Sequence, residues 1–188
     1  MKRSDFRIFK NMPELTTQRL RLRKIEISDV DDVFEYASDP AVSEFLLWHP
    51  HEKREYTKSY ICYLERLYKK GKFYDWGIEY QGKMIGTVGF TKINKRKNCA
   101  EIGYVLNRSF WGKGIGLDAV NALLKYGFCV LKLDKIDAVI MSENKRSEAL
   151  LLKCNFAHEY STDNKMLIKG EYRDICKLSL SKETFFKE

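Results

Sequence analysis

The middle of the chain reads Glu101-Ile-Gly-Tyr-Val-Leu-Asn-Arg-Ser-Phe-Trp-Gly-Lys-Gly-Ile-Gly-Leu-Asp-Ala-Val120. Apolar alternation over residues 100–106 predicts a strand, and the apolar spacing from Leu117 onward predicts an amphipathic helix. Three glycines, Gly112, Gly114 and Gly116, lie between them. Such a turn leaves backbone N–H groups bare at the positive end of the helix dipole. The stretch therefore predicts a bound di-anion of the pyrophosphate type, with a plain turn at a helix start as the alternative.

Two common nucleotide-binding patterns do not fit this turn. The dinucleotide fingerprint needs Gly-x-Gly-x-x-Gly, whereas the glycines here occupy every second position. A phosphate-binding loop of the Gly-x-x-x-x-Gly-Lys-Ser/Thr type does not occur in the chain.

Four segments together resemble one family. Trp111-Gly-Lys-Gly-Ile-Gly116 resembles the acetyl-CoA loop of the GNAT acetyltransferase superfamily, Arg/Gln-x-x-Gly-x-Gly/Ala, with Trp111 where Arg or Gln is usual. The other matching segments, 15–33, 144–156 and 169–180, resemble the family's first strand and helix, its Asn-x-x-Ser segment and its closing strand. The Trp-Gly-Lys-Gly form is similar to the ribosomal-protein N-terminal (alanine/serine) acetyltransferase branch.

The resemblance implies an α/β (α+β) fold, with a mixed, mostly antiparallel sheet of about six to seven strands flanked by helices. It places acetyl-CoA in the cleft where two strands splay apart. We expect one domain over residues 1–188, with an N-terminal extension at 1–13 and a C-terminal tail at 182–188. The residue patterns themselves predict strands at 20–25, 74–80, 84–93, 99–106, 135–141, from 158 to 160 onward and 174–180. They predict helices that start at Ser28, near Glu52, after Gly116 and at Arg146, the last ending at Asn155.

Composition narrows the class of protein. At 188 residues with 44% hydrophobic content, the chain suits one packed domain, and no apolar run approaches the ~20 residues of a membrane span. The start of the chain lacks the features of a signal peptide, and the five cysteines form no Cys-x-x-Cys pair, which predicts reduced thiols and a cytoplasmic location. Three histidines with this spacing predict no metal site.

A net charge of +8 suits a polyanionic partner such as coenzyme A or a ribosomal surface. The basic run at 92–98 lacks interleaved aromatic residues, so no direct nucleic-acid role is expected. A homodimer is common in the family, and the sequence does not decide it.

For catalysis, the resemblance implies Glu101 as general base, four residues before Val105, where the cofactor is contacted. The alternative is a structural glutamate. The pantetheine arm of the cofactor is expected along Tyr104, Val105 and Leu106, with the backbone N–H of Val105 or a neighbour stabilising the oxyanion. For the pyrophosphate we expect the backbone of Gly112, Lys113, Gly114, Ile115, Gly116 and Leu117, while the Lys113 side chain either adds charge or points to solvent.

The general acid is less defined. Leu151 stands where many relatives carry a tyrosine, so this position offers no phenol. Ser147 is the candidate instead, either as a catalytic group or as a partner of the cofactor. Asn144 is expected to bind the pantetheine amides. For both residues, capping of the following helix is the alternative.

The acceptor site is expected from the loop at 43–51 and from nearby aromatic residues: Trp48, His49, Trp76 and Tyr80. For each of these, core packing or a surface position is the alternative. The predicted activity is direct acetyl transfer from acetyl-CoA to a primary amine, foremost a protein N-terminal α-amine of ribosomal type. The alternatives are a small amine, such as a polyamine, an amino acid or an aminoglycoside, and a non-catalytic CoA-binding module.

Overall fold

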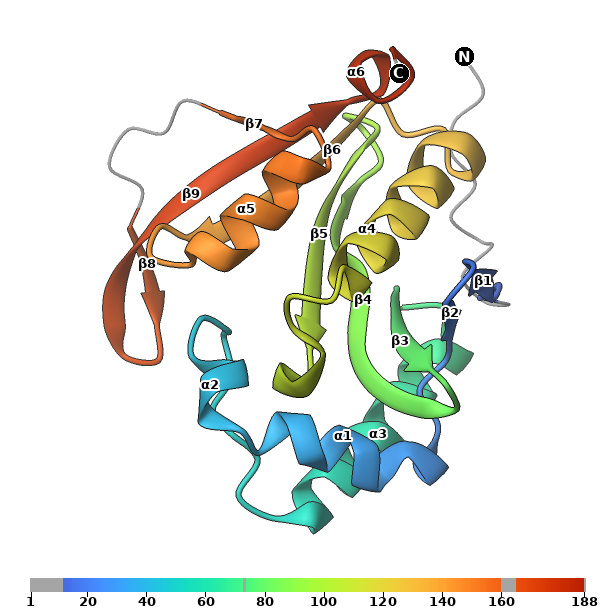
Figure 1. Ribbon diagram of the computed structural model, residues 1–188, viewed down its shortest axis with the longest axis vertical. Coiled ribbons are helices and arrows are strands. Elements are labelled where there is room, and N and C mark those ends of the chain that lie inside the picture. The colour runs from blue at the N-terminus through green and yellow to red at the C-terminus, as the bar shows by residue number, and fades with distance from the viewer. Residues whose placement is uncertain (1–11, 73, 160–164, 188) are drawn as a thin grey trace.

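The computed structural model describes residues 12–72, 74–159 and 165–187 (Figure 1). Its strands form one nine-stranded sheet in the order β1-β2-β3-β4-β5-β6-β9-β7, with β8 paired to β9. The strands are β1 (Leu15–Thr16), β2 (Leu20–Arg23), β3 (Asp75–Tyr80), β4 (Lys83–Asn94), β5 (Cys99–Leu106), β6 (Lys135–Met141), β7 (Ala157–His158), β8 (Lys165–Ile168) and β9 (Glu171–Ser181).

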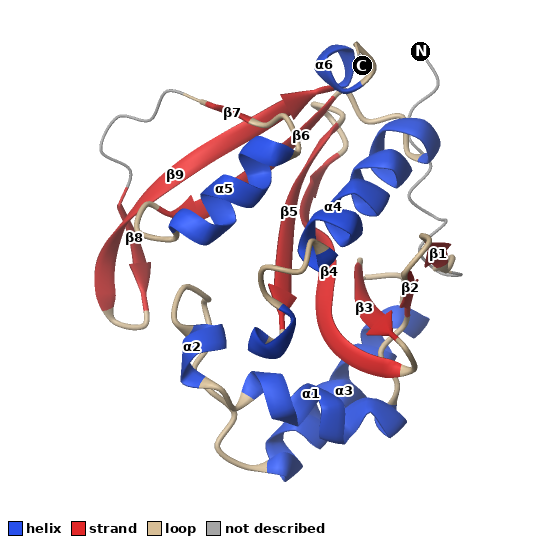
Figure 2. Ribbon diagram, viewed as in Figure 1, coloured by secondary structure: helices blue, strands red, loops and turns tan. Residues whose placement is uncertain are grey.

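Helices connect and cover the strands (Figure 2). The α-helices are α1 (Val30–Ala37), α2 (Pro40–Ser43), α3 (Arg54–Lys69), α4 (Ile115–Lys125), α5 (Lys145–Lys153) and α6 (Lys182–Phe185). Two short 3-10 turns, Ile27–Asp29 and Arg108–Phe110, precede α1 and α4, and a π-helical turn, Tyr126–Val130, extends α4. This element order confirms the predicted mixed α/β fold.

One pair of neighbouring strands, β5 and β6, pairs along only part of its length. β5 and β6 are parallel, whereas every other pair among the described strands is antiparallel. The parallel pairing runs only from Cys99↔Lys135 to Ile102↔Ala138. Beyond it, β5 stays with β4 up to Leu106 while β6 stays with β9 up to Met141. The two strands therefore separate after residue 102, as the resemblance implied.

The two faces of β5 meet different helices. Because side chains alternate along a strand, Tyr104 and Leu106 point to one face and Val105 to the other. α4 and α5 lie over the first face, toward the viewer in Figure 2. α1 and α3 provide tyrosines that share a cavity with Val105 and with Thr87, its partner on β4. α1, α3 and α4 each bury one apolar face, and together they close a core on both sides of the sheet.

Several details differ from the sequence predictions. Ser28 does not cap a helix, because it lies inside the turn Ile27–Asp29, which is closed by a capping box between Glu26 and Asp29. The sheet exceeds six to seven strands because the two-residue strands β1 and β7 and the hairpin strand β8 extend it. The predicted strand from residue 158 falls partly on residues 160–164, which lie outside the described residues. The predicted tail begins with α6.

Other local predictions hold. Asn155 ends α5 with a left-handed φ of 63°, the conformation expected of an asparagine that replaces glycine there. All five cysteine thiols are free. Within residues 12–72, 74–159 and 165–187, no helix combines the length and apolarity that crossing a bilayer would require. The cytoplasmic location stays a prediction of the sequence.

Candidate active site

A cavity of about 310 Å³ opens where β5 leaves β6. Its walls come from the end of β5, the glycine turn, the start of α5 and the α2 region. Ten of the predicted cofactor residues line it: Tyr104, Val105, Leu106, Gly112, Gly114, Ile115, Gly116, Leu117, Asn144 and Ser147. Lys113 is the exception, because its backbone carbonyl faces Arg19 and its ammonium lies 5.4 Å from the Phe110 ring centroid. The segments predicted from sequence thus converge on one cavity.

The glycine turn has the backbone that the sequence requires. Gly112 and Gly114 have φ angles of 74° and 73°, in the left-handed region that favours glycine, and Gly114 is the N-cap of α4. At Gly116 a Cβ atom would lie only 2.9 Å from Leu150 of α5, so the two helix starts approach closely there. The start of α4 therefore borders the cavity, and its glycines carry no side chain of their own, which fits a phosphate group bound by the first N–H groups of the helix.

Trp111, which departs from the family pattern, is fixed at both ends. Its indole N–H donates to the carbonyl of Leu106, at 2.8 Å. The guanidinium of Arg146 lies 3.6 Å from the Trp111 ring centroid, in cation–π contact. Arg146 also lines the cavity, as does Lys153. Trp111 thus holds a cation beside the glycine turn, an arrangement that suits phosphate groups.

A polar pair, Tyr104 and Ser147, also lines the cavity. The Ser147 hydroxyl donates to the Tyr104 phenol oxygen at 2.9 Å, and that phenol donates to the Ser147 carbonyl at 3.2 Å. Burial raises the pKa of Tyr104 well above its ordinary value, so the phenol keeps its proton. Although Leu151 is fully buried and offers no phenol, the structure supplies one from β5. Asn144 caps α5 by accepting from the Ser147 N–H at 3.1 Å, which was the alternative prediction for it.

Glu101 lies apart from the cavity. Its side chain is 21% exposed and pairs with the Lys92 ammonium at 3.0 Å, while the Thr91 hydroxyl donates to it at 3.2 Å. Glu101 lines neither cavity formed by the described residues. Both of its partners come from the bulged segment of β4 around residues 90–92.

A second cavity, of about 120 Å³, lies on the other face of β5. It is rich in aromatic side chains from α1, α3 and the loop between them. Its lining residues are Val33, Tyr36, Ala37, Trp48, His51, Tyr56, Tyr60, Thr87 and Val105. Val105 lines both cavities, so the two meet across β5 at the residue predicted to contact the acyl donor.

The four predicted acceptor residues separate in the structure. Trp48 lines the second cavity. His49 takes its alternative, an exposed surface position, and lines neither cavity, while Tyr80 packs edge-on against Phe110, with ring centroids 5.8 Å apart. The prediction for Trp76 was wrong: its side chain has no exposed surface and packs between Phe90 and Tyr126. A core tryptophan of this kind cannot touch an acceptor.

Sequence reasoning included His51 only as the end of the loop at 43–51 and missed Tyr56 and Tyr60; all three line the second cavity. The available signal was the run Trp48-His-Pro-His51, in which two histidines precede an amphipathic helix. Strand order and helix packing, which bring Val105 to the same cavity, are not local in sequence.

Comparisons with known proteins agree with this geometry. The chain matches the family model described as Acetyltransferase (GNAT) domain over residues 19–157. It is 35% identical over 176 residues to the Bacillus licheniformis protein named uncharacterized N-acetyltransferase p20, across 93% of this chain and 99% of that protein.

Two Escherichia coli K12 relatives are more distant. Spermidine N(1)-acetyltransferase is 24% identical, across 90% of this chain and 89% of its own length. The [ribosomal protein uS5]-alanine N-acetyltransferase is 26% identical, across 87% and 89%. The same fold occurs in a solved structure of RimL, a ribosomal L7/L12 α-N-protein acetyltransferase in complex with coenzyme A, with a TM-score of 0.78 and 22% identity, across 92% of this chain and 99% of that one.

Proposed function

Because this chain belongs to the GNAT acetyltransferase family, we propose that it transfers the acetyl group of acetyl-CoA directly to a protein N-terminal α-amine. It is an N-acetyltransferase of the GNAT type. The observation that carries the proposal is the meeting of two cavities at Val105, one with bare N–H groups and a cation, the other with aromatic walls. Donor and acceptor would then reach the same point from opposite faces of β5, as direct transfer requires.

Acetyl-CoA would supply an activated acetyl group as a thioester. The N–H groups from Gly112 to Leu117 would hold its phosphates, with Arg146 adding positive charge. The edge of β5 beyond residue 102, which β6 does not pair, offers backbone groups to an extended ligand. Val105 faces Thr87 of β4, as Asn107 faces Ile85, so by alternation its neighbours Tyr104 and Leu106 present their backbone N–H groups to this free edge. One of these N–H groups would stabilise negative charge on the acetyl oxygen, since it is fixed in advance.

Proton transfer needs further groups. Ser147 and Tyr104 form a hydrogen-bonded pair in the donor cavity, and we propose that one of these hydroxyls turns to donate a hydrogen bond to the departing sulfur, which leaves as a thiolate and takes its proton from solvent. Glu101 as general base stays a prediction, and its carboxylate is engaged in an ion pair with Lys92 at 3.0 Å. Substitution of Glu101 by Gln tests this role directly.

The acceptor cavity favours an α-amine over a polyamine. None of the described residues that line it carries a carboxylate, which several cationic amines would need. An α-amine, with a pKa near 8 against about 10.4 for an alkylamine, loses its proton more readily. At about 120 Å³ the cavity holds roughly four water-sized groups, which suits a small first residue such as Ser or Ala. The ribosomal relative acts on such an amine, and the spermidine relative makes the polyamine the alternative.

The test follows thiol release from acetyl-CoA with a panel of acceptors: Ser- and Ala-starting peptides, spermidine, amino acids and aminoglycosides. We expect the highest kcat/KM with the peptides and none with their N-acetylated forms. A preference for spermidine would replace the acceptor class. Tight acetyl-CoA binding by calorimetry, without transfer to any amine, would reduce the protein to a CoA-binding module.

A further inference from the structure

His51 lines the aromatic acceptor cavity, where it contacts three other aromatic rings. Its ring centroid lies 5.5 Å from that of Trp48, 4.7 Å from that of Tyr56 and 5.9 Å from that of Tyr60. The residue is only 8% exposed, and its backbone N–H donates to the carbonyl of Ala37 at 2.9 Å. Three rings and one backbone bond therefore hold the imidazole in a single place.

One ring nitrogen of His51 has a partner and the other is open. Nδ1 lies 2.8 Å from the Thr57 hydroxyl, whose side chain is fully buried in α3. Within the described part of the chain, Nε2 makes no hydrogen bond. When Nδ1 donates to Thr57, Nε2 carries the free lone pair of a ring that lines the same cavity as Val105.

The surroundings keep this imidazole neutral. Burial lowers the pKa of His51 below its ordinary value. The groups that face it are Trp48 from the loop, Tyr56, Thr57 and Tyr60 from α3, and Tyr36 from α1, with Thr87 from the sheet. Burial also raises the pKa of Tyr60 to about 12, so it carries no charge near neutral pH. No charged side chain lines the cavity among the described residues, so nothing there favours an imidazolium.

We propose that Nε2 of His51 accepts the proton of the acceptor amine in the transfer, a catalytic role on the acceptor side of β5. This inference rests on the proposed function. In the step, the nitrogen lone pair forms the bond to the acetyl carbon, the C–S bond breaks with its electron pair on sulfur, and the proton leaving nitrogen passes to Nε2. The imidazolium then returns this proton to solvent. A weak base suffices, because an amine N–H becomes strongly acidic as the nitrogen bonds to carbon.

The two candidate bases, His51 and Glu101, can be told apart by mutation. Both side chains could serve as a base, but only His51 lines the cavity that Val105 also lines. Glu101 is committed to Lys92 and Thr91. Removing the true base should abolish the rate, whereas removing the other should leave it nearly intact.

The experiment measures kcat/KM against pH for the full-length wild type, His51→Gln, Glu101→Gln and the matched control His49→Gln, with acetyl-CoA and a Ser-starting peptide. His49 is exposed and lies two residues away. We expect His51→Gln to lose about a hundredfold or more in kcat/KM, with unchanged acetyl-CoA affinity. The wild-type kcat/KM should fall at acid pH through two protonations, of the peptide amine and of His51, and in His51→Gln only the shallower fall due to the amine should remain. Full activity of His51→Gln, or the loss in Glu101→Gln instead, would overturn the proposal.

A second readout does not depend on turnover. Histidine 1H–15N spectra of the CoA-loaded protein contain signals from three histidines, which the His51→Gln and His49→Gln variants assign. We expect the Nε2 signal of His51 to move when the Ser-starting peptide is added, and not with its N-acetylated form. An unmoved signal would contradict the proposal even if His51→Gln failed to fold.

Thr57→Val adds a positioning test, since it keeps the imidazole but removes the partner of Nδ1. We expect a lower kcat, an unchanged KM for acetyl-CoA and a changed tautomer signal of His51 in the spectra. If the wild type acetylates spermidine rather than peptides, the acceptor class fails and the same variants are assayed with spermidine. A His51→Gln variant as active as wild type on that amine would overturn the role of His51 while the acetyltransferase function stands.

Discussion

Arg19 and Asp118, ninety-nine residues apart, form an ion pair that fastens the glycine turn to the start of β2: Nε of Arg19 donates to the Asp118 carboxylate at 2.8 Å. The same guanidinium donates to the carbonyl of Lys113 at 3.1 Å. Arg19 therefore spans the turn from Lys113 to the first helical residues of α4. Both side chains are partly exposed, so the pair positions the turn more than it stabilises the fold.

Replacing Arg19 by Ala should weaken acetyl-CoA binding without unfolding the protein. The turn would lose its outer anchor, and its N–H groups would spend less time in the binding geometry. We expect the Kd for acetyl-CoA, measured by calorimetry, to rise roughly three- to tenfold. Arg21→Ala is the matched control, because Arg21 pairs with Glu14 and does not touch the turn. Equal effects of the two substitutions would show that only the overall charge matters.

Trp111→Phe should reduce cofactor affinity more than it reduces stability. Phenylalanine keeps most of the apolar contact but removes the N–H that donates to Leu106, and it offers a weaker surface for Arg146. The lost hydrogen bond costs about 1 kcal/mol of unfolding free energy. We expect a higher Kd for acetyl-CoA and an unchanged KM for the acceptor. Trp48→Phe should raise the KM for the acceptor and leave the Kd for acetyl-CoA unchanged, since Trp48 lines only the second of the two cavities.

The cavity predicted to bind the acyl donor could be predicted from the sequence because the residues that form it are close together in the chain. A strand, three glycines and a helix follow one another, and the backbone of such a turn needs no distant partner. β5 (Cys99–Leu106) and β6 (Lys135–Met141) were predicted with the bounds that they have. Gly112–Leu117, apart from Lys113, line the donor cavity as expected. Their role in binding stays a prediction until it is measured.

The cavity proposed for the acceptor could not be predicted from the sequence, because it forms where helices and strands that are far apart in the chain pack together. Alternation along β3 separates Trp76 from its neighbours, but it does not say which face α4 will cover. In the structure Tyr126 covers Trp76 and removes it from any site. His51 and Val105 share a cavity only because α1 and α3 fold against β4 and β5. Such contacts join residues far apart in sequence, which periodicity cannot reveal.

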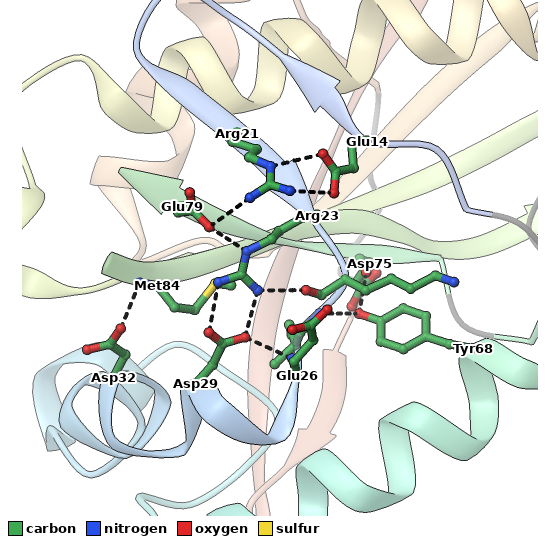
Figure 3. Close-up of polar contacts among 12 residues, drawn as sticks. Glu14, Arg21, Arg23, Glu26, Asp29, Asp32, Tyr68, Asp75, Glu79 and Met84 are labelled. Carbon is green, nitrogen blue, oxygen red and sulfur yellow. Dashed lines mark hydrogen bonds and ion pairs between the residues drawn. The ribbon is translucent and has the colours of Figure 1, made fainter. Parts of the chain in front are cut away.

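Arg23 should be the most sensitive charged residue for stability (Figure 3). It donates to both carboxylate oxygens of Asp29 at 2.8 Å and also pairs with Glu79, while only 13% of its side chain is exposed. Arg23→Met would leave Asp29 buried without its cation, so we expect a loss of about 3–5 kcal/mol in the free energy of unfolding by urea. Arg23→Lys should lose about 2 kcal/mol, since the fork geometry is lost but the charge remains.

The control for this prediction is Arg21→Met. Arg21 lies on the same strand and is labelled beside Arg23 in Figure 3, but its side chain and that of Glu14 are both about half exposed. Its removal should leave the unfolding curve almost unchanged. Comparable losses for Arg21→Met and Arg23→Met would mean that burial does not determine the strength of these pairs.

Asp75 should make the protein less stable as the pH rises through the acid range. Its carboxylate leans over Gly89, with one oxygen 2.0 Å from where a Cβ of Gly89 would lie, and burial raises its pKa to about 7. An unfolded chain releases this proton near pH 3.9, so between about pH 4 and 7 the folded state holds a proton that the unfolded state lacks. The unfolding free energy therefore falls across this window and levels off above it.

Asp75→Asn removes the ionisation while keeping the shape of the side chain. At pH 8 we expect the variant to be more stable than wild type, by up to about 4 kcal/mol at 1.36 kcal/mol per pKa unit, and the two should converge near pH 4. Urea unfolding at pH 4.5, 6 and 8 measures the difference, with Asp134→Asn, an exposed carboxylate, as the control. If the difference between Asp75→Asn and wild type stays constant across these pH values, Asp75 does not titrate in the window that its burial implies.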